Sequence, residues 1–308
     1  MLKKKLSISL LISLAVFCRT AAAVHPAEDI IRLYAEELSY TDQIEPYITG
    51  LLALNELEHG RNADKVRAFI EWYFSALNYP DRYNINATIY VYGIDGDVLT
   101  PSYAYDSIDG YSGLFLHLLL RYVNLTGDLA IVSDNWQKVE DTAYTIPLLQ
   151  EKDGLTIALI TTNQKYLMDN CEAYGGMSAY IELRKLMNLP PSLSYENIRE
   201  NIKRGIMKRM YRRKDRIFIH TIENDIVQDA DWNTYYPDAY AQLFPIYYEL
   251  LEDDPALGRQ LWRRFSEKHA ANENTFPTEQ RIMFQLTRNK ARVKYPDLFA
   301  APRSRLNK

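Results

Sequence analysis

The chain has 308 residues, of which 12% are aromatic and 25% are charged. Its 36 Lys and Arg residues are outnumbered by 40 Asp and Glu residues, which gives a formal net charge of −4. This balance argues against nucleic acid as the main partner, because a nucleic-acid site needs a basic surface. A chain of this length can bury a large apolar core, so a globular protein is expected.

The first 23 residues have the three parts of a secretory signal peptide. Lys3, Lys4 and Lys5 form a basic start, an apolar run follows over 6–17, and Ala-Ala-Ala at 21–23 is a cleavage site. The apolar run is too short to span a bilayer comfortably. We therefore predict a signal peptide over 1–23, a single domain over 24–308, a secreted or periplasmic location, and no stable membrane span after cleavage.

Cleavage would change both the charge and the cysteine content. It would lower the number of Lys and Arg residues from 36 to 32 against 40 acidic residues, a net charge of −8. It would also remove Cys18 and leave Cys171 alone, so no intrachain disulfide could form. We expect a monomer that depends on its apolar core.

Helical periodicity dominates the rest of the chain. Amphipathic helices are predicted at 28–38, 43–58, 62–77, 106–125, 128–149, 170–188, 195–212, 238–251, 255–271 and 277–294. Two segments, 86–100 and 215–227, have the alternating pattern typical of short strands. No Gly-, Pro- or Ser-rich linker interrupts the series, which favours one domain.

Four of these helices share a plan in which an acidic residue is followed by very small residues. The acids are Glu45, Asp109, Glu172 and Asp238, and they recur about every 60 residues, the length of a helical hairpin. Glycine inside a helix costs about 1 kcal/mol relative to alanine, so close packing of inner helices should offset it. The pattern predicts an all-α protein, an (α/α)-toroid of about five to six helical hairpins with short β-strand decorations. The inner helices would begin around one mouth.

Two segments carry a resemblance to a known superfamily. "YDSIDGYSGLFLHLLLRYVNLTGDLAIVSDNW" (105–136) resembles the Asp-Ser-Val-Asp…Tyr…Thr-Gly-Asp segment of six-hairpin glycosidases, and "MDNCEAYGGMSAYIELRKLM" (168–187) is similar to another of their inner helices. The resemblance in layout runs over most of 40–270. It implies a loop that delivers aspartates to a sugar site, and a turn at 126–128 that joins an inner helix to an outer one.

The chain is also similar to glycoside hydrolase family 8, the bacterial endoglycosidases of this fold. By position, that resemblance implies Glu45 as the catalytic acid, Asp109 as a sugar-contacting residue and Asp238 as the late aspartate. The Ser-Glu-Gly setting of the family glutamate is absent, because Glu45 lies in "QIEP".

Further acids stand near the starts of the same helices. Glycoside hydrolysis commonly uses two carboxyl groups, and a neighbouring carboxylate or an apolar wall can keep the acid protonated. Asp106 and Asp109 are three residues apart, so Asp109 could bind sugar hydroxyls while Asp106 or a more distant carboxylate transfers the proton. Asp169 and Glu172 are candidates to line the site. Helix capping is the alternative for all of these acids.

The segment "QDADWNTYYPDAYAQ" (228–242) interleaves acids with aromatic residues. Asp231, Trp232, Tyr235 and Tyr236 precede Asp238, and aromatic faces beside carboxylates suit a platform for sugar rings. The alternatives are that Asp238 caps a helix and that the aromatic residues anchor a loop.

The sequence therefore predicts an exported glycoside hydrolase that acts on a polysaccharide or oligosaccharide. Its carboxylate pair would come from Glu45, Asp106, Asp109 and Asp238, and the stacking residues would be Tyr105, Trp232, Tyr235 and Tyr236. The 5 histidines have no metal-binding spacing, so no metal and no cofactor are expected. One alternative is a non-catalytic glycan-binding or polysaccharide-assembly protein on the same fold. Another is a polysaccharide lyase that uses Tyr105 and Arg121.

Overall fold

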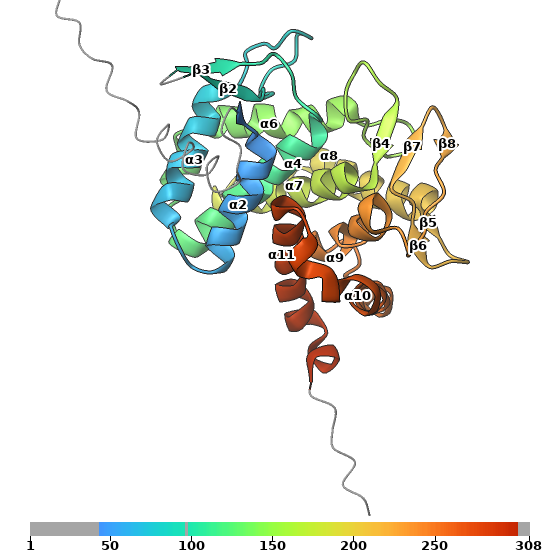
Figure 1. The fold of residues 1–308 in the computed structure, drawn as a ribbon. Helices are drawn as coiled ribbons and strands as arrows, with labels where there is room; N and C mark the ends of the chain where they lie inside the picture. Colours follow the sequence, from blue (N-terminus) through green and yellow to red (C-terminus); the bar gives the residue numbers. More distant parts are fainter. Residues whose placement is uncertain (1–42, 96–97, 301–308) are drawn as a thin grey trace, which may run out of the picture.

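The computed structural model describes residues 43–95 and 98–300, and helices dominate this part of the chain (Figure 1). The α-helices are α2 (Pro46–Glu58), α3 (Ala63–Ala76), α4 (Asp109–Thr126), α5 (Ala130–Ser133), α6 (Trp136–Leu149), α7 (Leu167–Leu186), α8 (Leu193–Gly205), α9 (Phe244–Tyr247), α10 (Pro255–His269) and α11 (Thr278–Lys294). Short helical turns are η1 (Ile206–Met210), η2 (Tyr235–Ala239), η3 (Ala270–Thr275) and η4 (Pro296–Phe299). The predicted signal peptide and the helix predicted at 28–38 lie outside the described residues.

Short antiparallel strands decorate the connections between helices, as predicted. One sheet has the order β1 (Gln43–Ile44), β2 (Tyr92–Asp95), β3 (Val98–Pro101). A second has the order β4 (Gln164–Tyr166), β7 (Thr221–Glu223), β8 (Ile226–Val227), with Tyr166 opposite Thr221. The third pairs β5 (Tyr211–Arg212) with β6 (Ile217–Phe218).

The helices form two concentric layers. In the inner layer α2 contacts α4, α4 contacts α7, and α7 contacts α9; α11 contacts both α9 and α2 and so closes the ring (Figure 1). The outer helices α3, α6, α8 and α10 each contact the inner helix that precedes them in the chain. The fold is therefore an (α/α)-toroid, and the prediction of an all-α toroid is confirmed.

Helices α4 and α7 approach so closely that only glycine fits between them. A Cβ atom on Gly113 would lie 2.3 Å from the carbonyl oxygen of Glu172, and one on Gly176 would lie 2.4 Å from the Cα of Gly113. These are the small residues that follow the helix-start acids in the sequence. Their spacing is explained by backbone contact, which holds the starts of α4 and α7 side by side.

The helix predicted over 238–251 is interrupted. Only α9 is α-helical there, preceded by the turn η2. Pro245 has no N–H to donate to the carbonyl of residue 241, which favours an interruption of the helix in this segment. Glu249 then adopts a left-handed conformation with φ of 59°. The start of the segment is therefore irregular, and it places Tyr236 and Tyr240 at the end of the ring where the inner helices begin.

Candidate active site

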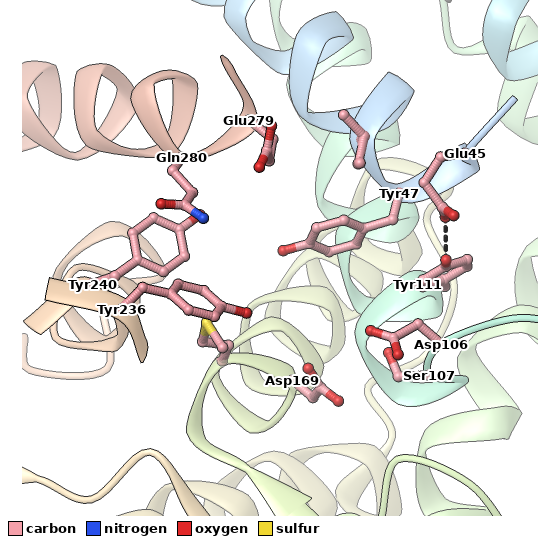
Figure 2. Close-up of a pocket in the computed structure, with 12 residues that line it drawn as sticks. Glu45, Tyr47, Asp106, Ser107, Tyr111, Asp169, Tyr236, Tyr240, Glu279 and Gln280 are labelled. Carbon is pink, nitrogen blue, oxygen red and sulfur yellow. Dashed lines mark hydrogen bonds between the residues drawn. The ribbon is translucent and has the colours of Figure 1, made fainter. Parts of the chain in front are cut away.

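The starts of the inner helices surround a cavity of about 420 Å³ (Figure 2). Most of its lining comes from residues at or just before the first turn of α2, α4, α7 and α11. The rest comes from η2 and from the residue that follows it. These residues are Glu45, Tyr47, Ile48, Asp106, Ser107, Tyr111, Met168, Asp169, Tyr236, Tyr240, Glu279 and Gln280. The predicted mouth at the inner-helix starts is thus a cavity built from segments more than 200 residues apart.

The two sides of the cavity differ in chemistry. In Figure 2, Tyr236, Tyr240 and Gln280 stand on one side, and the hydroxyl of Tyr47 points toward them from the other. Acids occur around the cavity, and no Lys or Arg belongs to the described lining. A cavity of this kind offers acceptors for hydroxyl groups and flat rings for sugar faces.

Glu45 is a partly buried carboxyl group whose pKa is raised. Burial against the cavity wall raises the pKa of Glu45 to about 7, and the nearby charge of Asp106 raises it further. The hydroxyl of Tyr111 donates a hydrogen bond to Oε1 of Glu45, and this bond partly offsets the effect of burial by lowering the pKa of Glu45. Asp106 itself is exposed and lines the same cavity. The two carboxyl groups therefore stand in different environments within one site.

A second pair of acids lies buried one helical turn below the rim. Asp109 and Glu172 are both 0% exposed. The hydroxyl of Thr156 and the N–H of Gly110 donate to Asp109, and burial raises the pKa of Asp109 to about 7. The hydroxyl of Tyr47 donates to Oε1 of Glu172 at 2.6 Å, and burial raises the pKa of Glu172 well above its usual range. Burial of both acids at the floor of the site therefore favours their protonated forms.

Gly110 allows these acids to gather. A Cβ atom at this position would lie 2.6 Å from Oγ of Ser107, 2.9 Å from Oε2 of Glu172 and 3.4 Å from Cγ of Asp169. Burial raises the pKa of Asp169 well above its usual range, and the charges of Asp109 and Glu172 add to this. Glu172 and Asp169 of α7 thus border the space that a side chain at residue 110 would fill, and Asp109 of α4 is near enough for its charge to act on Asp169.

Asp238 does not belong to the cavity lining. Its side chain is buried, with Oδ1 2.6 Å from Nδ1 of His220 and Oδ2 accepting the N–H of Asp231 at 2.8 Å. Asp231 is exposed, and its carboxylate accepts the N–H of Asn233. Asp238 therefore contacts β7's flanking residue and its own loop, and its predicted catalytic role stays a prediction.

The predicted aromatic residues divide between cavity and interior. Tyr236 lines the cavity and is 53% exposed. Tyr105 is buried and donates to Asp81 at 2.7 Å. Trp232 is also buried, under the guanidinium of Arg264. Tyr235 lines a neighbouring cavity instead. Of these rings, Tyr236 is the one that faces the acidic cavity, and stacking by the others stays a prediction.

Several residues that line the cavity were not predicted from the sequence. They are Tyr47, Tyr111, Tyr240, Glu279 and Gln280. Two signals were available: Tyr47 stands two residues after Glu45, and Glu279 stands in the first turn of the helix predicted at 277–294. Neither signal shows that α11 closes the ring beside α2.

The structure separates the two residues considered for a lyase. Tyr105 precedes the first turn of α4, whereas Arg121 lies twelve residues after its first residue, about 18 Å along the helix at 1.5 Å per residue. Arg121 pairs with Glu58 at 3.1 Å. The two side chains therefore cannot act on one substrate atom.

Within residues 43–95 and 98–300, no helix is long and apolar enough to cross a membrane. No group of three or more His, Cys, Asp or Glu side chains in these ranges is arranged to hold a metal ion.

The chain resembles known proteins in structure but not in sequence. No protein-family model matches it, and no curated protein matches its sequence. A rhamnosidase from Klebsiella oxytoca, solved with rhamnose bound, superposes with a TM-score of 0.53 and 12% identity over 89% of this chain and 55% of its own. Cellobiose 2-epimerase from Bacillus thermoamylovorans gives a TM-score of 0.50 and 11% identity over 73% of this chain and 59% of its own.

A GH76 α-mannanase from Bacteroides thetaiotaomicron gives a TM-score of 0.48 and 9% identity over 88% of this chain and 69% of its own. The chain spans little more than half the length of the rhamnosidase and the epimerase. At these identities the likeness is one of fold. The chain shares the (α/α)-toroid fold with the rhamnosidase and the epimerase.

Proposed function

We propose that this protein is an exported glycoside hydrolase that acts on a polysaccharide or oligosaccharide through carboxyl groups at the mouth of the toroid. The observation that carries the proposal is the acidic cavity, in which Glu45 has a pKa raised to about 7 beside the exposed carboxylate of Asp106. The fold, shared with a rhamnosidase and a sugar epimerase, supports it.

Glu45 is the general acid and Asp106 the general base in this proposal. Glu45 donates its proton to the glycosidic oxygen as the bond to the anomeric carbon breaks, and Asp106 removes a proton from the attacking water. The negative charge of Asp106 raises the pKa of Glu45, which favours the protonated form that a general acid needs.

The remaining acids bind and position the substrate. Asp169 and Glu279 line the cavity and accept hydrogen bonds from sugar hydroxyls, and Tyr236 stacks on a ring. Asp109 and Glu172 support the floor through their hydrogen bonds to Thr156 and Tyr47. We assign them no proton transfer, because they are fully buried.

The test is sugar release from a panel of polysaccharides, measured as new reducing ends. Glu45→Gln and Asp106→Asn are each expected to lower release at least about 100-fold, the usual worth of a positioned acid or base. Asp64→Asn is the matched control, because Asp64 is an exposed acid in the first turn of the outer helix α3.

Unchanged release in both variants would reject this assignment. Binding of a polysaccharide by the wild-type protein without any release would instead favour the non-catalytic glycan-binding alternative. Export is tested separately, by sequencing the N-terminus of the protein recovered outside the cytoplasm, where cleavage near Ala23 is expected.

A further inference from the structure

A second cavity of about 350 Å³ adjoins the acidic cavity. The two share Tyr236 and Gln280 as common wall residues. The rest of the second lining comes from η2, η3 and the residues next to them: Tyr235, His269, Asn272, Thr275, Phe276 and Pro277. The exposed ring of Tyr236 therefore stands between two hollows that are each above the size of about 300 Å³ at which ligand pockets begin.

The second cavity has a different chemistry from the first. No Asp, Glu, Lys or Arg belongs to its lining as the structure describes it, which consists of rings, an amide and hydroxyl groups. The Tyr235 ring stacks on Phe276 with centroids 4.3 Å apart and 16° between the planes. His269 is held in place, with Nε2 2.8 Å from the carbonyl oxygen of Trp232. A surface of this type, whose described lining has no carboxylate, ammonium or guanidinium group, fits a neutral sugar.

Two residues of this lining, Tyr235 and Gln280, each carry a buried polar atom. The hydroxyl of Tyr235 and Oε1 of Gln280 are both covered from solvent, and neither has a hydrogen-bond partner among residues 43–95 and 98–300. A buried polar atom without a partner costs about 1–3 kcal/mol.

We propose that the second cavity is a sugar-binding subsite, and that the substrate is a neutral oligosaccharide or polysaccharide chain that passes over Tyr236. One sugar unit lies in the acidic cavity, where the bond is cleaved, and the chain continues into the neutral cavity. This inference rests on the proposed function of the acidic cavity. It adds that the protein selects chains over single sugars.

The experiment measures affinity against chain length. Calorimetry on the full chain would use linear neutral gluco-, manno- and rhamno-oligosaccharides of one to six units. Affinity for the sugar that binds is expected to rise at least about tenfold between the shortest bound chain and longer ones, and then to level off when both cavities are filled.

Thr275→Trp is the blocking variant, because Thr275 is exposed and lines the neutral cavity without reaching the acidic one. This variant should abolish the rise in affinity with chain length and leave the affinity for the shortest sugar unchanged. Ser133→Trp on α5 is the matched control, since Ser133 is also exposed and both hydroxyls donate to the carbonyl three residues earlier. Asn272→Ala is a milder second variant, expected to lower affinity for long chains about two- to fivefold.

Three results separate the two proposals. A gain that persists in Thr275→Trp and Asn272→Ala overturns the subsite. Binding and cleavage of short sugars with no gain for longer chains overturns the subsite and leaves the hydrolase proposal standing. Absence of binding and cleavage for every sugar, together with no release from polysaccharides, overturns both.

Discussion

At the scale of single residues, the site is built from two pairs of acids with the same spacing. Asp106 and Asp109 are three residues apart at the start of α4, and Asp169 and Glu172 are three apart at the start of α7. In each pair the first acid lines the cavity and the second is buried beneath it. Asp169 and Glu172 both lie in α7, where residues three apart are on the same side of the helix, whereas Asp106 lies in the loop just before α4.

The hydrogen bond from Tyr111 to Glu45 gives a prediction at this scale. The bond stabilises the ionised form of Glu45, so Tyr111→Phe should raise the pKa of Glu45 above its value of about 7. If Glu45 is the general acid, activity is lost as pH rises through that pKa. The alkaline limb of the pH–activity profile should therefore move to higher pH in the variant.

The measurement is the rate of sugar release from pH 5 to pH 10 for wild type and Tyr111→Phe. Tyr180→Phe is a suitable control, because Tyr180 is also a buried tyrosine whose hydroxyl donates to a glutamate, Glu140, but it does not line the acidic cavity. If the alkaline limb of Tyr111→Phe lay at the same pH as that of wild type, this would argue against Glu45 as the acid.

At the scale of elements, the contact between α4 and α7 fixes the geometry of the site. Gly113 lies against the backbone of α7 at Glu172 and Ala173. Glu172 also carries one of the buried carboxyl groups of the site. The acids of the two helices are therefore positioned by main-chain contact, which has no freedom to adjust by side-chain rotation. This explains why glycine stands there in spite of its cost in a helix.

Gly113→Ala should therefore destabilise the protein strongly. The added methyl group would lie 2.3 Å from the carbonyl oxygen of Glu172, so the helices must separate, at an expected cost of about 3 kcal/mol or more in the free energy of unfolding. Urea unfolding followed by circular dichroism measures this cost. Gly93→Ala in β2 is the control, since its nearest neighbouring atom would be 3.8 Å away. Equal stability of the two variants would contradict the close-contact explanation.

At the scale of the whole molecule, burying several acids at one mouth makes stability depend on pH. Burial raises the pKa of Asp109 from 3.8 to about 7 in the folded protein. A folded state that holds a proton more tightly than the unfolded chain is favoured at low pH. This contribution is fully present below about pH 4 and is lost as pH rises through about 7.

Asp109→Asn should remove this pH dependence. At pH 8 the variant is expected to be more stable than wild type, by roughly 2–4 kcal/mol if the whole effect of the pKa shift is recovered, whereas at pH 3, below the unfolded pKa, the difference should be small. Thermal unfolding at the two pH values measures the change. A variant that is less stable than wild type at pH 8 would show that the carboxylate of Asp109 is tolerated in its buried position.

The toroid was predictable because its signals are local. Apolar periodicity depends on neighbours three and four residues apart, and the acid followed by glycine or alanine recurs on helices of similar length. Pro245 was also a local signal, for an interruption of the helix. The prediction of a continuous helix over 238–251 followed the apolar periodicity instead. The predicted mouth followed from the same repeat, and it brought Glu45, Asp106 and Asp169 into the candidate site.

What the sequence could not decide is which side chains face the cavity. Tyr236 and Trp232 stand four residues apart in the same aromatic segment, yet the first is exposed and the second is buried under Arg264. Glu279 and Gln280 join the site only because α11 returns to pack between α9 and α2. The sequence by itself thus determined the helices, their pairing into a toroid and the acids at their starts, since these follow from short-range spacing. Only the tertiary structure decided burial, the raised pKa values and the neutral cavity beside the acidic one, because these depend on contacts between segments far apart in the chain.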